Sequence, residues 1–191
     1  MPSKSIISSI LPTAGIFKLN QDHVFKSFDC GDGGEDLNNF LINDSKKHLK
    51  HFLTVTYLLE AEGKTIAYYS LANDLLKISV NDDRDFKRKL RKKIKDDFLY
   101  ELFKIGSFPA VKLGRFAVHK DYQSRGIGSE LLGLITYSFI NDSNKTGCTF
   151  ITVDALNNSK TISFYERNGF SFLSPNDIGD ENRAMYKCLI Y

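Results

Sequence analysis

Hydrophobic residues recur along this chain of 191 residues with two different periods, one of two residues and one of three to four. A period of two places apolar side chains on one face of a strand. It marks Thr54–Leu59 and Thr65–Ala72, and the glycine-bearing turn Glu62–Lys64 between them predicts a β-hairpin. Further strands are expected within residues 13–28 and at Val111–Val118, Thr149–Ala155, Phe170–Leu173 and Met185–Ile190.

Apolar residues spaced three or four apart predict helices over residues 35–50, 82–104, 126–141 and 159–168. The helix at 126–141 is apolar on most sides, so we expect it to be largely buried. Pro109 is expected to end the helical segment before the strand at Val111, because proline removes a backbone donor. The Asn168–Gly169 end of the last helix suits a left-handed cap.

The order of these elements predicts an α/β (α+β) architecture, with a mixed central β-sheet flanked by helices. The chain is long enough for one domain with its own core, and we expect a single domain over residues 1–191. No apolar run approaches the roughly 20 residues that span a bilayer, and residues 1–12 have an apolar core too short for a secretory signal. Three widely spaced cysteines without metal-ligand spacing predict reduced thiols, a cytoplasmic protein and no metal site.

The net charge of +3 conceals a local concentration of positive charge, because eight of the twelve residues from 84 to 95 are basic. Apolar residues recur through this stretch at every fourth position, at Phe86, Leu90, Ile94 and Phe98. We interpret the stretch as an amphipathic helix within a basic helical insertion at about 79–106. Its cationic face is either solvated surface or a contact for an anionic partner such as RNA.

A glycine-bearing turn joins the strand ending at Val118 to the apolar helix, with the sequence Gln123-Ser124-Arg125-Gly126-Ile127-Gly128. Such a turn leaves backbone N–H groups pointing at one spot, at the positive end of the helix dipole. The spot suits a pyrophosphate, which glycine lets approach the amides closely. The alternative is an ordinary helix entry. A nucleotide P-loop is disfavoured because no lysine precedes Ser129, and the dinucleotide fingerprint lacks its third glycine.

Val118 to Gly128 resembles the acyl-CoA-binding motif of the GNAT N-acetyltransferases, written Q/R-x-x-G-x-G/A. The predicted element order is also that of the GNAT fold. Two further blocks are similar to the carboxy-terminal part of this family, Val153–Asn157 and Phe164–Phe170. The stretch from Phe28 to Leu41 resembles the amino-terminal pattern of the toxin-type branch, whose members are encoded beside small DNA-binding antitoxins. The resemblance covers about residues 25–190.

The resemblance implies that acetyl-CoA is the co-substrate and that no metal takes part. The amides from about Ser124 to Ser129 would hold its pyrophosphate, while Phe116 and Val118 would run beside the pantetheine. Arg125 either pairs with a phosphate or faces solvent. Asn157 or its neighbour Asn158 contacts the pantetheine or caps the following helix. The implied cofactor-binding set is Phe116, Ala117, Val118, Gln123, Ser124, Arg125, Gly126, Ile127, Gly128, Ser129 and Asn157.

Tyr165 is the expected catalytic residue, because the resemblance places a tyrosine of FYERNGF-type segments near the CoA sulfur as general acid. A phenol with a pKa of about 10 is a sensible proton donor to a departing thiolate. The alternative is that Tyr165 only packs in the core. The general base stays open between Asp154, His119 and no dedicated base, since an α-amine with a pKa near 8 arrives partly neutral.

The expected function is direct transfer of an acetyl group from acetyl-CoA to a primary amine. Two alternatives stay open: toxin-like acetylation of aminoacyl-tRNA, and a non-catalytic domain that binds acyl-CoA or RNA. The sequence and the resemblance suggest as partners an amine acceptor, tRNA through residues 84–95, a small antitoxin and a second copy of the chain, but no membrane. The sequence does not identify the acceptor, the oligomeric state or the role of the basic segment.

Overall fold

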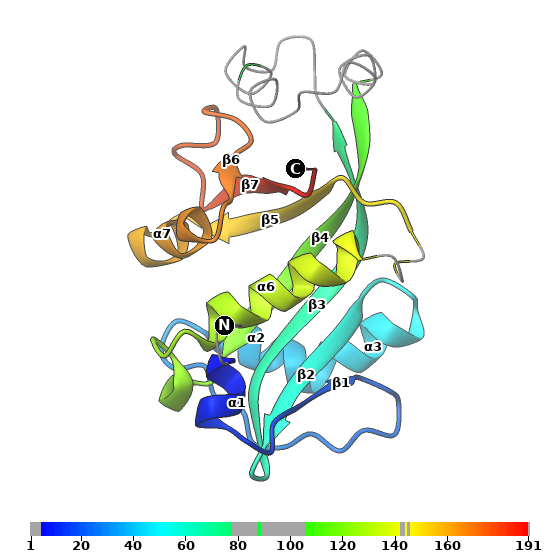
Figure 1. Cartoon of the computed structure of the whole chain (residues 1–191), viewed down its shortest axis with the longest axis vertical. Helices are drawn as coiled ribbons and strands as arrows, with labels where there is room; N and C mark the ends of the chain where they lie inside the picture. The colour runs from blue at the N-terminus through cyan, green and yellow to red at the C-terminus, as the bar shows by residue number, and fades with distance from the viewer. Residues whose placement is uncertain (1–4, 78–87, 89–105, 142–143, 145, 191) are drawn as a thin grey trace. The chain divides into compact units, whose positions relative to one another are not determined.

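The computed structural model describes residues 5–77, 88, 106–141, 144 and 146–190 (Figure 1). Seven strands form one mixed sheet in the order β1-β2-β3-β4-β5-β7-β6, so the expected α/β architecture is confirmed. The chain divides into two compact units, residues 1–72 with 113–134 and residues 73–112 with 135–191. Strands β3 and β4 and helix α6 have residues in both units, and each unit is described by itself.

The first unit contains the amino-terminal half of the chain and the motif turn. Its elements are α1 (Ile6–Ile10), β1 (Gly15–Lys18), α2 (Glu35–Asn39), the π-helical segment η1 (Phe40–Asp44), α3 (Ser45–Lys50), β2 (Val55–Ala61), the 3-10 helix η3 (Lys120–Tyr122) and parts of β3 (Lys64–Lys77), β4 (Ser107–Val118) and α6 (Ile127–Ile140). Strands β1, β2 and β3 pair antiparallel in this order. Glu62 and Gly63 both have positive φ, as a two-residue hairpin turn requires, so the predicted hairpin is confirmed.

The core of the first unit lies between its strands and the α2–η1–α3 segment. Phe40 stacks on Tyr68 with ring centroids 6.2 Å apart, and the Tyr68 hydroxyl donates a hydrogen bond to the carbonyl oxygen of Leu37 at 2.8 Å. The buried members of this cluster are Leu19, Phe40, Leu41, Leu58, Tyr68 and Ala117. This packing explains the predicted helix at 35–50, because its apolar side covers the core.

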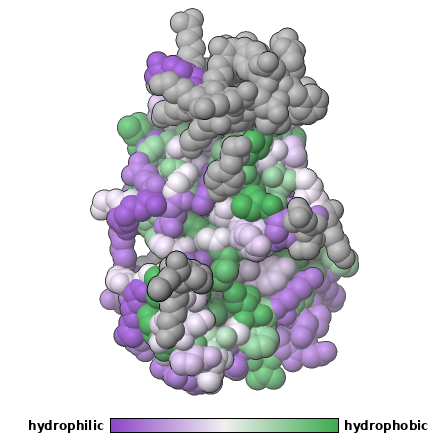
Figure 2. Space-filling model, in the orientation of Figure 1, coloured by the Kyte–Doolittle hydropathy of each residue, from purple (hydrophilic) through white to green (hydrophobic). Residues whose placement is uncertain are grey.

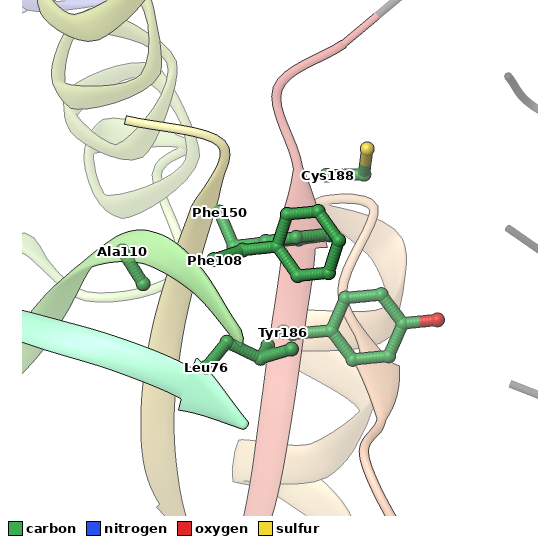
Figure 3. Packing of buried hydrophobic residues seen from close by; sticks show 6 residues of the cluster. All are labelled: Leu76, Phe108, Ala110, Phe150, Tyr186 and Cys188. Carbon is green, nitrogen blue, oxygen red and sulfur yellow. The ribbon is translucent and has the colours of Figure 1, made fainter. Parts of the chain in front are cut away.

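The second unit comprises residues 73–112 and 135–191. It contains β5 (Phe150–Leu156), α7 (Ser159–Arg167), β6 (Ser171–Phe172) and β7 (Asn182–Cys188). Strand β5 pairs parallel with β4 and antiparallel along its whole length with β7. Figure 3 shows the apolar cluster of this unit, in which Phe150 contacts Phe108 and Tyr186 edge-to-face at 5.7 and 5.8 Å. Such aromatic pairs stabilise beyond the area that they bury.

Three expectations about elements need correction. Pro109 does not precede its strand but lies inside β4, where its carbonyl oxygen accepts a hydrogen bond from the Thr149 amide. Helix α6 is not largely buried: Ile127, Leu131 and other residues of one face are in the core, whereas Leu134 is 44% exposed. The short helix α1 was not anticipated.

The other elements predicted within the described residues are confirmed, although the helix at 35–50 is divided by the π-helical segment, and the helix predicted over 82–104 lies outside the described residues except for Arg88. Gly169 ends α7 with a φ of +86°, as the left-handed cap requires. The basic insertion at about 79–106 lies outside the described residues except for Arg88 and Gly106. None of the helices in the described part of the chain is long and apolar enough to cross a membrane.

Buried tyrosines make the stability of this fold sensitive to alkaline pH. Burial raises the pKa of Tyr68 and Tyr165 well above the usual value near 10, and that of Tyr186 to about 12. Above pH 10 the unfolded chain releases these protons while the folded chain retains them. The contribution of these tyrosines to the free energy of unfolding is therefore fully present below pH 10 and is lost as the pH rises toward 12. We expect the urea midpoint to fall between pH 9 and 11, and to fall less in Tyr186→Phe. An equal fall in both proteins would contradict this assignment.

Candidate functional site

The turn between β4 and α6 has the backbone conformation that its glycine-bearing sequence predicts. Ser124 and Gly126 have φ values of +60° and +84°, and α6 begins at Ile127. Left-handed residues that alternate with ordinary ones turn successive N–H groups toward one concave side, where they can bind an anion. The dipole of a 14-residue helix adds positive potential at the same place. The turn therefore fits a pyrophosphate.

Side chains around this turn point in different directions. Ile127 is 1% exposed and packs in the core, whereas Ser124, Arg125 and Ser129 are exposed. Ile127 is therefore available to a ligand only through its main chain. The Arg125 guanidinium lies over the Tyr122 ring at 5.5 Å from its centroid, so this side chain is in contact with the last residue of η3.

Gln123 acts on the turn through two backbone carbonyls. Its Nε2 donates hydrogen bonds to the carbonyl oxygens of Val118 at 3.0 Å and of Cys30 at 2.8 Å. These bonds fasten the start of the turn to the end of β4 and to the loop after Phe28. The sequence predicted Gln123 as a cofactor-binding residue, and its amide nitrogen is engaged in positioning the turn.

A second link between the same loop and the turn involves Asp29 and Lys120, which sequence reasoning missed. The Lys120 amide donates to the Asp29 carbonyl oxygen at 2.8 Å, and the Lys120 ammonium lies 2.7 Å from the Asp29 carboxylate. The bond from Lys120, helped by the Gly31 amide, lowers the pKa of Asp29 to about 2. The sequence showed only a local turn at Phe28–Gly31, and no pattern in it indicates a partner so far along the chain.

Helix α1 contacts the first turn of α6, which the sequence also did not indicate. The Glu130 carboxylate accepts hydrogen bonds from the Ser5 hydroxyl and from the Ile7 amide, the latter at 2.7 Å. A Cβ added at Gly126 would lie 2.9 Å from Cδ1 of Ile6. The glycine is therefore favoured twice, by its positive φ and by the side chain of α1 beside it.

The part of β4 in the first unit presents mainly backbone to a ligand. Ala117 is 4% exposed, with its side chain in the core of this unit, and the Val118 carbonyl already accepts the bond from Gln123. Phe116 is half-buried. The contacts of Phe116 and Val118 with the pantetheine stay a prediction, in which the Val118 carbonyl oxygen already has a partner.

Tyr165 lies in the second unit, on α7. It is 6% exposed, and its ring contacts Phe164 and Phe170 edge-to-face at 5.2 Å each. Its hydroxyl forms no hydrogen bond with another group in the described ranges. Burial raises the pKa of Tyr165, so the phenol stays protonated across the neutral range. The ring is packed in a fixed orientation while the hydroxyl keeps its proton to donate.

Asn157 and Asn158 have separate tasks. Asn158 is the N-cap of α7, and its Oδ1 accepts the Thr161 amide at 2.8 Å. The Nδ2 of Asn157 donates to the carbonyl oxygens of Ile178 and Asp180 at 3.1 and 2.8 Å. Asn157 therefore holds the loop before β7. These two bonds use its Nδ2, so its Oδ1 remains for a ligand.

Both candidate bases are engaged in structural contacts. His119 is buried rather than part of the surface, and its Nδ1 accepts the Asp121 amide at 3.2 Å as the N-cap of η3. The Asp154 carboxylate forms an ion pair with Lys112. These contacts favour an amine that arrives already deprotonated over a dedicated base.

Comparison with known proteins identifies the class. Residues 95–172 match the acetyltransferase (GNAT) domain family. The structure of AtaT complexed with acetyl-methionyl-tRNAfMet is similar with a TM-score of 0.68 and 24% identity, covering 92% of this chain and 94% of that one. The crystal structure of AtaTR bound with AcCoA gives 0.66 and 23%, covering 94% and 95%. A crystal structure of a KacT mutant gives 0.69 and 22%, covering 93% and 95%. No curated protein matches the sequence.

Residues 95–172 thus match a GNAT acetyltransferase domain, in agreement with the strand, turn and helix around Gly126. This match agrees with the expected acetyl-CoA-dependent N-acetylation of an amine. The likeness to the solved structures covers more than nine-tenths of each chain and shows that the fold is shared.

Proposed function

We propose that this acetyltransferase acts on the α-amino group of an aminoacyl-tRNA. The observation that carries the proposal is the likeness to AtaT, which is seen complexed with acetyl-methionyl-tRNAfMet and matches over 92% of this chain. The chemistry agrees, because an α-amine with a pKa near 8 is partly neutral at neutral pH. A lysine amine with a pKa near 10.4 would need a base, and both candidate bases are engaged elsewhere.

The residues of the turn and of α7 have distinct roles in this proposal. The backbone amides from Ser124 to Ser129, Gly128 included, hold the pyrophosphate, and Gln123 keeps the turn in place. The amine nitrogen bonds to the acetyl carbon as the carbon–sulfur bond breaks. The leaving sulfur takes a proton from the Tyr165 hydroxyl, and the proton that the nitrogen releases returns through solvent to the Tyr165 oxygen, so the tyrosine is restored and the charges balance.

The raised pKa of Tyr165 defines what this residue supplies. Because burial raises that pKa, the phenol is protonated at neutral pH and has a proton to donate to the departing sulfur. Its hydroxyl has no partner among the described residues to compete for that bond. A donor held in a buried, apolar setting stabilises developing charge more strongly than one in water.

We further propose that the protein is cytoplasmic and controlled by a small antitoxin. The three cysteines are free, as expected for a reducing compartment. The related AtaT has been seen bound to the carboxy-terminal part of the antitoxin AtaR. The contact of residues 84–95 with tRNA and the homodimer stay proposals, since that segment lies outside the described residues except for Arg88.

An acceptor screen tests the proposed substrate. We expect purified protein and acetyl-CoA to release CoA with charged tRNA at least a hundredfold faster than with uncharged tRNA, a polyamine or a lysine-containing peptide. The reason is that only the charged tRNA offers an α-amine on the bound nucleic acid. Nuclease digestion followed by mass spectrometry should find an N-acetylated aminoacyl-adenosine. Equal rates with the peptide would reject the tRNA acceptor.

A domain that binds acetyl-CoA without catalysis would behave differently in the same assay. It would be stabilised against heat by acetyl-CoA and release no CoA with any acceptor. The Tyr165 hydroxyl, which has no hydrogen-bond partner among the described residues, favours the enzyme, because a purely structural position would be served equally well by phenylalanine.

A further inference from the structure

Phe52, in the turn after α3, is the most exposed large apolar residue in the described part of the chain. Its side chain is 95% exposed, and the following Leu53 is 58% exposed. Its backbone has a φ of +57°, in the left-handed region that an aromatic residue seldom adopts. Exposure and backbone strain both act against phenylalanine at this position.

Hydrogen bonds identify the turn as the Schellman end of a helix. The Phe52 amide donates to the Leu49 carbonyl at 3.2 Å, and the Leu53 amide donates to the His48 carbonyl at 2.9 Å. Phe52 thus occupies the left-handed position that normally belongs to glycine. Packing does not explain the choice, since the phenyl ring is almost fully exposed.

Helix α7 of the same chain ends in the same way and provides a comparison. There the left-handed position is Gly169, with bonds from Gly169 to Glu166 and from Phe170 to Tyr165, both at 3.0 Å. The residue after it, Phe170, is 3% exposed. The end of α7 thus has glycine at the left-handed position and a buried apolar residue after it. The end of α3 has Phe52 and Leu53 at the same two positions, and both are exposed.

Basic residues precede the exposed ring in the sequence. The stretch from 44 to 54 contains Lys46, Lys47 and Lys50 against a single Asp44, and Lys50 and His51 are exposed next to Phe52. Lys47 pairs with Asp44 at 2.9 Å, and Lys46 donates to the Gln21 carbonyl. On the face shown in Figure 2, hydrophilic side chains gather over the region of α3 in Figure 1. Cations near a helix end also interact with its dipole, but the dipole calls for no aromatic ring.

We propose that Lys50, His51 and Phe52, which we call the α3 tip, bind single-stranded RNA. An exposed aromatic ring beside cations is the combination that binds unpaired nucleotides: a base stacks on the ring and a phosphate lies beside the ammonium group. The inference rests on the proposed tRNA acceptor and adds a surface at which an unpaired segment of that RNA binds.

Replacing Phe52 with glycine separates this role from a structural one. Glycine relieves the backbone strain, so we expect Phe52→Gly to melt about 2–4 °C higher than the wild type. Loss of one stacked base should weaken binding of a fluorescein-labelled, unstructured 12-mer RNA at least fivefold in anisotropy measurements. We also expect Lys50→Glu to weaken binding and to lower the salt dependence by about one phosphate contact.

Two control variants test whether the loss of RNA binding is specific to the aromatic ring at position 52. Phe52→Tyr should bind RNA like the wild type, as should Tyr137→Ala, which removes an aromatic residue 63% exposed on α6. The RNA binding measurement needs no acetyl transfer, so it can succeed even if charged tRNA is not acetylated. Unchanged RNA affinity in Phe52→Gly would overturn the proposal. So would a Phe52→Gly variant whose only defect is weaker self-association in sedimentation, because the α3 tip would then serve a protein contact.

Discussion

Gly126→Val is expected to lower the affinity for acetyl-CoA at least tenfold while the fold is retained. Gly126 has a φ of +84°, which a β-branched residue cannot adopt without strain, and the left-handed conformation costs an ordinary residue about 1–2 kcal/mol. The valine side chain would also meet Ile6, whose Cδ1 lies 2.9 Å from the Cβ position. The turn must open, and its amides then no longer converge on a phosphate.

Isothermal titration calorimetry with acetyl-CoA and with CoA measures this effect, and circular dichroism confirms that the helices are intact. Gly133→Ala is the matched control on α6, because nothing lies within 4 Å of an added Cβ there. Alanine at that helical position should stabilise by about 0.5–1 kcal/mol and leave binding unchanged. Gly126→Asn should be milder than valine, since asparagine tolerates the left-handed region. Wild-type affinity in Gly126→Val would remove this turn from the acetyl-CoA site.

Tyr165→Phe is expected to lower kcat at least tenfold, which corresponds to about 1.4 kcal/mol of transition-state stabilisation. The substitution keeps the ring between Phe164 and Phe170 and removes only the hydroxyl. Because that hydroxyl has no hydrogen bond in the described chain, folding stability should change by less than about 0.5 kcal/mol. The Kd for acetyl-CoA should stay near its wild-type value, since the hydroxyl acts on the leaving sulfur.

The pH dependence of kcat/KM in the wild type tests the role of Tyr165 as general acid. In the wild type, kcat/KM should rise with the deprotonation of the acceptor amine and should not fall before pH 10, because burial keeps the Tyr165 proton in place. Tyr186→Phe is the control, as Tyr186 is another buried tyrosine with a raised pKa in the same unit. Full activity in Tyr165→Phe would leave Tyr165 as a packing residue only.

Local patterns in the sequence were reliable guides to local structure. The Glu62–Gly63 turn, the end of α7 at Gly169 and the strand, turn and helix around Gly126 all form where the sequence predicts. Each depends on the backbone preferences of a few neighbouring residues, above all on glycine at positive φ. Pro109 was the exception, because a strand can contain a proline whose neighbours pair around it.

Functional side chains were less predictable because their partners lie far away in the chain. Gln123 bonds to a carbonyl 93 residues distant, and Glu130 bonds to Ser5 across 125 residues. Asn157 and Asn158 were equivalent candidates in the sequence, and only the loop at 178–181 gave them different tasks. No periodicity within a segment specifies such contacts.

The sequence by itself determined the order of the predicted elements, the glycine turn and the GNAT resemblance, because each depends on the types and spacing of residues that are close together in the chain. Tertiary structure decided that Gln123 positions the turn, that His119 is buried and that Phe52 is exposed on a strained backbone. The physical reason is that burial and hydrogen-bond partners depend on which distant segments pack together, whereas helix, strand and turn preferences depend on the neighbours of each residue.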